Sequence, residues 1–146
     1  MDEIEKVINQ IRQDNKILLE NFEESLERGG LSKKTVDKHV RNSDFFINEF
    51  LLYEDPMPAN EGCAHISMFL GYWFIKKAMW ANSLAIKENA ASLKIFYTFL
   101  CELGEVEEKD LKEMIKVIKE EMPDWIATMK RYDDPNIDDM KEVWDL

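Results

Sequence analysis

A cysteine and a histidine lie close enough in the sequence to share a metal ion. Cys63 and His65 are separated by one residue, and zinc accepts both thiolate and imidazole ligands. A structural zinc site needs further ligands at a suitable spacing, but His39 and Cys101 are distant in the sequence. We therefore expect no metal site. We expect Cys63 and Cys101 to be unpaired thiols, which are typical of a reducing compartment.

Paired carboxylates are the other side chains that could do chemistry. Glu107 with Glu108 and Asp133 with Asp134 could exchange protons or hold calcium, but neither pair has the spacing of a calcium-binding loop. Runs of charge usually form the solvated face of a helix. The sequence also contains no glycine-rich phosphate loop and no Gly-x-Ser-x-Gly motif. We therefore predict a protein that is not an enzyme and has no cofactor and no small-molecule substrate.

Basic side chains gather in two short segments of an acidic chain. The 146 residues carry a formal net charge of −11. Residues 30–48 nevertheless hold four basic and two acidic residues, and residues 76–94 hold four basic residues and one acidic residue. Lysine and arginine bind DNA by neutralising its phosphates, although an acidic total argues against broad DNA affinity. The candidate DNA contacts in these segments are Lys33, Lys34, Lys38, Arg41, Lys87 and Lys94.

Helices must position these side chains, because apolar residues recur about every 3.6 positions through most of the chain. No stretch alternates apolar and polar residues for long enough to indicate a strand. We predict an all-α fold, namely an orthogonal bundle of four core helices with an added N-terminal helix and a short acidic C-terminal extension. The predicted helices span residues 2–28, 32–53, 60–79 and 84–103, a fifth begins at 107, and a short one lies within 135–146.

Glycine, proline and capping residues set the expected ends of these helices. Gly30 and Gly104 are expected to end helices, and Ser32 is expected to cap one. Pro123 lies inside the helix that begins at residue 107 and is expected to kink or split it. The length predicts one domain. Its parts are an N-terminal helix (1–29), a helical bundle (30–131) and an acidic C-terminal tail (132–146).

The N-terminal helix carries an apolar stripe that permits two interpretations. Its members are spaced by four, three, seven and four residues, which resembles a coiled-coil seam, and Asn15 lies at an inner position. The stripe could pair two copies of the chain, or it could pack on the helix's own domain. The stripe consists of Ile4, Ile8, Ile11, Leu18 and Phe22.

The later helices each have an apolar face and a charged face. Lys34, Lys38 and Arg41 share the side of the second helix opposite its apolar face, and Lys87 and Lys94 do the same on the fourth. We expect the last long helix to point seven apolar residues inward. These are Leu111, Ile115, Ile118, Met122, Trp125, Ile126 and Met129.

Two ordered runs resemble a known architecture. The run from Gly30 to Val36 (GLSKKTV), followed by Phe45 to Leu51 (FFINEFL), resembles the first helix of the core-binding domain of tyrosine recombinases, which include the phage integrases. The resemblance covers residues 30–131 and implies a four-helix, SAM-like N-terminal domain. The residues that resemble the third helix of that domain are Ser92, Leu93, Phe96, Tyr97, Leu100 and Gly104.

The resemblance implies DNA contact through the family's first and third helices, which here carry both sets of basic residues. It does not extend to catalysis, because the four arginines are scattered and lack the spacing of the recombinase catalytic set. We therefore expect the tyrosines to be structural and not nucleophiles. They are Tyr53, Tyr72, Tyr97 and Tyr132.

Two functions follow as alternatives. The first is a non-catalytic domain that binds DNA weakly and with strong salt dependence. The second is an acidic module for protein–protein interaction or self-association that keeps the fold without binding DNA. The sequence has no long apolar stretch, and its first five residues are too acidic for a signal peptide. We therefore expect a cytoplasmic location and no membrane partner.

Overall fold

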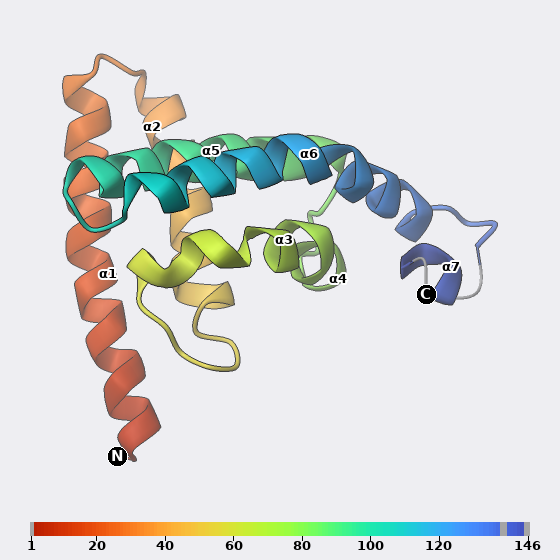
Figure 1. Ribbon diagram of the computed structural model, residues 1–146, viewed down its shortest axis with the longest axis horizontal. Coiled ribbons are helices and arrows are strands. Elements are labelled where there is room, and N and C mark those ends of the chain that lie inside the picture. The colour runs from red at the N-terminus through yellow and green to blue at the C-terminus, as the bar shows by residue number, and fades with distance from the viewer. Residues whose placement is uncertain (1, 138–139, 145–146) are drawn as a thin grey trace.

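The chain folds into helices alone in the part that the structure, a computed structural model, describes: residues 2–137 and 140–144 (Figure 1). The predicted all-α class is confirmed. Residues 138–139 and 145–146 of the predicted acidic tail lie outside the described residues. The α-helices are α1 (Glu3–Arg28), α2 (Lys33–Asp44), α3 (Ile66–Met68), α4 (Phe74–Lys77), α5 (Ser83–Glu102), α6 (Glu108–Tyr132) and α7 (Met140–Trp144). The other segments are the π-helices η1 (Phe45–Phe50) and η3 (Phe69–Trp73) and the 3-10 helix η2 (Ala59–His65).

The long helices form two crossed groups. In Figure 1, α1 and α2 run vertically, and α5 and α6 run across them. α2 packs against both α1 and α5, and α5 packs against α6. The middle segments, from η2 to η3, lie against α6. α7 lies at the far end of the molecule from α1 (Figure 1). This arrangement leaves one side of α2, one side of α5 and the first part of α1 at the surface, where the candidate residues lie.

Local signals set the helix ends as predicted. Ser32 caps α2, and its Oγ accepts a hydrogen bond from the Thr35 backbone N–H (3.3 Å). Gly30 and Gly104 follow α1 and α5 with φ of 84° and 79°, a left-handed conformation that favours glycine. Each of these capping features involves only residues close to the helix end. The ends of these helices can therefore be predicted from the sequence alone.

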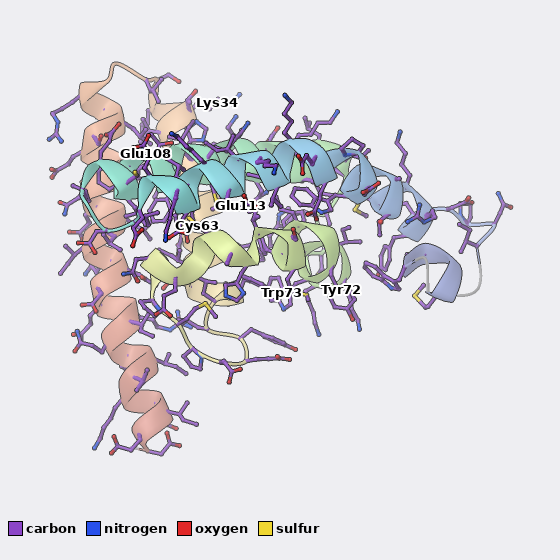
Figure 2. All side chains as sticks on the ribbon, in the orientation of Figure 1. Lys34, Cys63, Tyr72, Trp73, Glu108 and Glu113 are labelled. Atoms are coloured by element: carbon purple, nitrogen blue, oxygen red, sulfur yellow. The ribbon has the colours of Figure 1, made fainter. Side chains whose placement is uncertain are left out.

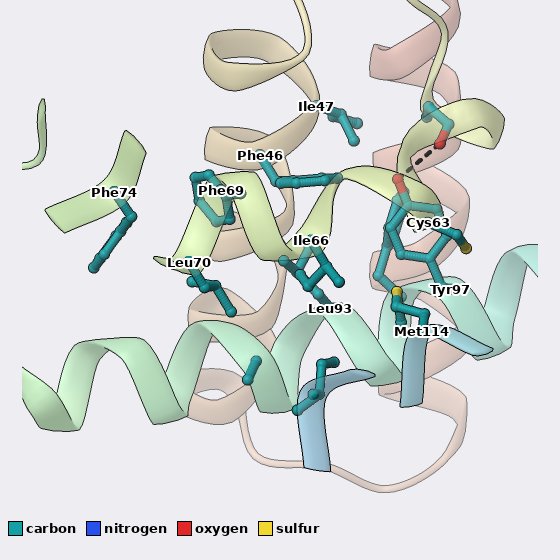
Figure 3. Close-up of a cluster of buried hydrophobic side chains, with 14 of the residues drawn as sticks. Phe46, Ile47, Cys63, Ile66, Phe69, Leu70, Phe74, Leu93, Tyr97 and Met114 are labelled. Carbon is teal, nitrogen blue, oxygen red and sulfur yellow. Dashed lines mark hydrogen bonds between the residues drawn. The ribbon is translucent and has the colours of Figure 1, made fainter. Parts of the chain in front are cut away.

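The middle helix differs from the regular helix predicted for residues 60–79. It begins as the 3-10 helix η2, because the chain must pass very close to Tyr97. Tyr97 Oη donates a hydrogen bond to the Ala59 carbonyl oxygen (2.7 Å; Figure 3). A Cβ atom at Gly62 would lie 2.1 Å from Tyr97 Oη, so only glycine fits there. A contact between segments 35 residues apart thus selects the local helix type.

The last long helix differs from the predictions in two respects: Pro123 does not split it, and Ile115 is not buried. α6 continues from Glu108 to Tyr132 through Pro123 without a split. Buried residues on both sides of the proline, Ile118 and Trp125, hold the two parts against the core, which offsets the lost backbone hydrogen bond. Ile115 is also 39% exposed, whereas Met114 is 1% exposed. The buried face is therefore rotated slightly from the predicted one.

The core joins the three central parts of the fold through aromatic contacts. The Phe46 ring of η1 packs against Phe69 of η3 (ring centroids 4.9 Å) and against Tyr97 of α5 (6.1 Å). Figure 3 shows this cluster with Ile66 and Met114 beside it. Within the described residues, no helix is both long and apolar enough to cross a membrane.

The short C-terminal helix forms within the predicted range and docks on the rest of the protein. Val143 is buried, and the Trp144 ring packs on Tyr72 (centroids 4.7 Å). Arg131 Nε also donates a hydrogen bond to the Val143 carbonyl oxygen (3.0 Å). These contacts tie α7 to α6 and to η3.

Candidate interaction surfaces

Hydrogen bonds bring the two basic helices side by side. His39 Nδ1 of α2 lies 2.8 Å from Ser92 Oγ of α5, and Asn42 Nδ2 donates to the same oxygen (3.0 Å). Burial, with a smaller effect from the Lys38 charge, lowers the pKa of His39. A neutral His39 is therefore part of the α2–α5 contact.

The six candidate DNA contacts differ in how free they are. Lys33 is paired with Asp37 (Nζ to Oδ2, 3.0 Å). The other five make no ion pair with any residue that the structure describes. Lys34, labelled in Figure 2, is exposed with Arg41 and Lys87, whereas Lys38 and Lys94 are half-buried. Five of the six basic groups are thus unpaired at the surface.

The basic side chains of α2 and the basic side chains of α5 do not point in the same direction. Ser92 marks the side of α5 that faces α2, because it bonds both His39 and Asn42. At 3.6 residues per turn, Lys87 and Lys94 lie about 140° and about 160° around α5 from Ser92. The α5 lysines therefore point away from α2. The structure does not bring the two sets together into a single groove.

The α1 stripe divides into a buried part and an exposed part. Phe22 is fully buried, and its ring packs on Phe96 of α5 (centroids 5.1 Å). Asn15 Nδ2 donates to Asn48 Oδ1 (2.8 Å) and to the Ile47 carbonyl oxygen (3.3 Å). From Ile11 onward the stripe therefore follows the second interpretation, because these residues pack on the protein's own core.

The first part of α1 has no such cover. Figure 1 shows it extending past the rest of the molecule. Ile4 is 64% exposed, Val7 is also exposed, and Ile8 is half-buried. Val7 belongs to this surface although the sequence prediction left it out. These three residues form what we call the α1 patch, on one side of the helix at i, i+3 and i+4.

The Cys63 thiol lies in an environment unsuited to nucleophilic chemistry. It lines a pocket of about 520 Å³ between η2 and α6, together with Asp110 and Glu113 (Figure 2). Burial, aided by the nearby Asp110 charge, raises the pKa of Cys63 to about 12, so the thiol stays protonated near neutral pH. Cys101 is also a free thiol, as expected. Among the described residues, no three His, Cys, Asp or Glu side chains are grouped to hold a metal ion.

Two smaller pockets with aromatic walls were missed by the sequence reasoning. The first, of about 240 Å³, is lined by Tyr53, Tyr72 and Trp73, of which the last two are labelled in Figure 2. The second, of about 230 Å³, is lined by Phe45 and Trp80 with polar residues from α2 and α5. A tryptophan in a short break between predicted helices, Trp80, could have indicated the second pocket. The polar residues that line the pocket with it come from distant segments, and no sequence pattern indicated them.

Comparison of the chain with protein-family models, with curated proteins and with solved structures found no match. The resemblance to recombinase core-binding domains therefore rests on the sequence pattern alone.

Proposed function

We propose that this protein is a non-catalytic helical interaction module that self-associates through the α1 patch. The observation that carries this proposal is the exposure of Ile4 and Val7 on a helix segment that extends beyond its own core. Apolar stripes on helices are normally buried against another element. A second α1 offers the same stripe, so two copies can cover each other.

The charges along α1 favour an antiparallel pair. The first turn is acidic, with Glu3 and Glu5 after the capping Asp2. In a parallel pair, the acidic turns of the two copies would lie side by side and repel each other. An antiparallel pair centred on the α1 patch moves them apart along the helix axis, so the charge of the first turn selects the orientation of the pair.

The net charge gives self-association a distinctive salt dependence. Two copies that each carry −11 repel one another, and salt screens this repulsion. We expect self-association to strengthen when salt rises from about 50 mM to about 500 mM. DNA binding would weaken over the same range, because released counterions drive it.

Sedimentation velocity at micromolar to high-micromolar concentrations tests the proposal. The double variant Ile4→Ser with Val7→Ser should be monomeric where the wild type associates. Leu84→Ser is the matched control, because Leu84 is as exposed as Ile4 but lies on α5. A wild type that stays monomeric at all salt concentrations, or a control that dissociates equally, would contradict the proposal.

Weak DNA contact through α2 is the second candidate function. The observation that favours it is that Lys34, Lys38 and Arg41 are unpaired on one side of a helix that resembles the recombinase first helix. Three basic groups release few counterions, so binding should be detectable only at low salt.

Fluorescence anisotropy with a short DNA duplex at about 50 mM salt tests this candidate. Lys34→Glu with Arg41→Glu should abolish binding. Lys87→Glu with Lys94→Glu should reduce it much less, because those lysines point away from α2. Absence of binding by the wild type, or equal losses in both double variants, would remove the α2 surface from consideration.

A further inference from the structure

The pocket where the end of α2 meets the start of α5 combines aromatic and charged walls. Its volume is about 230 Å³. Pockets for drug-sized molecules are usually roughly 300–1,000 Å³, so a ligand that fits here is small. We call it the α2–α5 pocket. Its lining residues are Arg41, Asn42, Asp44, Phe45, Glu49, Trp80 and Asn89.

One residue that lines this pocket, Asn89, carries a buried hydrogen-bond acceptor that has no partner among the described residues. Asn89 is 3% exposed, and its Nδ2 donates to the Ala85 carbonyl oxygen (2.8 Å). Its Oδ1 has no hydrogen-bond partner among the described residues and no contact with solvent. Buried polar atoms are nearly always hydrogen-bonded, so an unpaired one calls for an explanation. A ligand N–H group would provide the missing partner.

The charges around the pocket also favour a ligand that donates hydrogen bonds. Asp44 and Glu49 contribute two carboxylates, whereas Arg41 contributes one guanidinium. Neither carboxylate is paired with Arg41 at ion-pair distance. Asp44 accepts one hydrogen bond from Asn48 and has a second oxygen to offer. The two carboxylates outnumber the one guanidinium, so the formal charge of the lining is negative and attracts a cation.

The aromatic wall is open to a ligand. Trp80 is 55% exposed, and its ring packs edge-on against Phe45 (centroids 5.0 Å). None of the described lysines or arginines lies over the Trp80 ring. The exposed indole ring therefore offers apolar area to the body of a ligand. Because Asn89 Oδ1 is buried, a ligand reaches it only when the side chains that cover it move aside.

The other aromatic pocket is a weaker candidate for the same chemistry. Its tyrosine rings already have cations over them, with Lys77 Nζ 5.3 Å from the Tyr53 centroid and Lys76 Nζ 5.5 Å from the Tyr72 centroid. Its unpaired buried atom, Trp73 Nε1, is a donor, but the acidic rim of that pocket repels acceptors. In the α2–α5 pocket two carboxylates outnumber the one guanidinium, and the unpaired buried atom is an acceptor.

We propose that the α2–α5 pocket binds a small ligand with a primary ammonium group attached to an apolar body. The ammonium donates to Asn89 Oδ1 and to the carboxylates of Asp44 and Glu49. The apolar body lies against Trp80 and Phe45. This site is independent of the α1 patch, because none of its residues lies on α1.

Isothermal titration calorimetry of the full chain with phenethylammonium tests this site. We expect saturable binding with a dissociation constant of about 1 mM or lower. Asn89→Leu should weaken it at least about tenfold. Glu49→Gln and Trp80→Ala change exposed residues that should not affect folding, and each should weaken it several-fold. Glu54→Gln is the matched control, since it removes a carboxylate from the other aromatic pocket.

Three results would overturn the proposal. The first is no saturable binding up to about 20 mM. The second is unchanged affinity in both Glu49→Gln and Trp80→Ala. The third is an equal loss in the Glu54→Gln control.

A second titration distinguishes the sources of the ammonium group. Phenylalanine has the same ring and ammonium with an added carboxylate, which Arg41 could bind. Tighter binding of phenylalanine that is lost in Arg41→Gln identifies an amino acid as the ligand class. Tighter binding of phenethylammonium that is kept in Arg41→Gln identifies a simple amine.

Discussion

The two halves of α1 share one helix and one apolar period but have different surroundings. From Ile11 onward the stripe packs against α2, η1 and α5, and Phe22 is fully buried. Before Ile11 the same period continues, but Ile4 and Val7 face outward. Apolar residues at a helical period show that one face of the helix tends to be buried. They do not show whether the residues that bury this face belong to the same chain or to another.

The largest expected difference between the halves is in stability. Phe22→Ala should lower the free energy of unfolding by about 3–5 kcal/mol, because it leaves a cavity among the rings of α5. Ile4→Ala should change it by no more than about 0.5 kcal/mol, as is usual for an exposed site. Urea denaturation at low micromolar concentration, where the chain is monomeric, measures both. Similar losses in the two variants would mean that the first half is also packed.

Replacing a polar residue should also cost more stability in the second half of α1 than in the first, although the difference should be smaller. Asn15→Ala removes the donor to Asn48 and to the Ile47 carbonyl oxygen, which should cost about 1–3 kcal/mol. Gln10→Ala, on the exposed half, loses only a surface hydrogen bond to Asp14 and should be nearly neutral. Urea denaturation again gives the answer. A neutral Asn15→Ala would show that these two hydrogen bonds do not hold α1 in place.

Acid should weaken the buried contact between α2 and α5, which contains His39. The folded protein lowers the pKa of His39 below its unfolded value of about 6.5, so the unfolded chain binds more protons as pH falls. The stability that depends on neutral His39 is present above about pH 6.5 and is lost as pH falls toward the folded pKa. His39→Gln should flatten this part of the pH–stability curve. A variant with the wild-type slope would assign that slope to other groups.

The smallest expected change in stability accompanies the clearest change in assembly. Ile4→Ser with Val7→Ser should leave monomer stability within about 0.5 kcal/mol of wild type while removing self-association. Chemical denaturation and sedimentation of the same sample compare the two quantities. A variant that loses stability in proportion to its loss of association would mean that the folded monomer depends on its partner.

Sequence reasoning was accurate where the signal is local and failed where a distant contact decides. The caps at Ser32, Gly30 and Gly104 were predicted because each is completed within a few residues. The split at Pro123 was wrong because packing by flanking residues outweighed one lost hydrogen bond. Ile115 was predicted to be buried, but Met114 is buried instead. Which side of a helix is buried depends on where the neighbouring helix lies.

The candidate surfaces show the same division. The basic residues of α2 and α5 were found from composition, but their different directions depend on how Ser92 meets α2. The α2–α5 pocket was not found, because it joins residues 41–49 to residues 80–89. No periodic pattern links these two segments in the sequence.

The sequence by itself determined that the chain is helical, where most helices begin and end, and which segments carry charge. Hydrophobic period, capping side chains and glycine act over a few residues, so they can be read from order alone. Only the tertiary structure decided that the later part of the α1 stripe is buried and that its first part is exposed. It also decided that Gly62 must lack a Cβ against Tyr97, and that Asn89, whose amide oxygen has no partner among the described residues, lines the same pocket as Trp80. These outcomes depend on packing between segments that are distant in sequence, where steric fit and unpaired polar atoms are set by the whole fold.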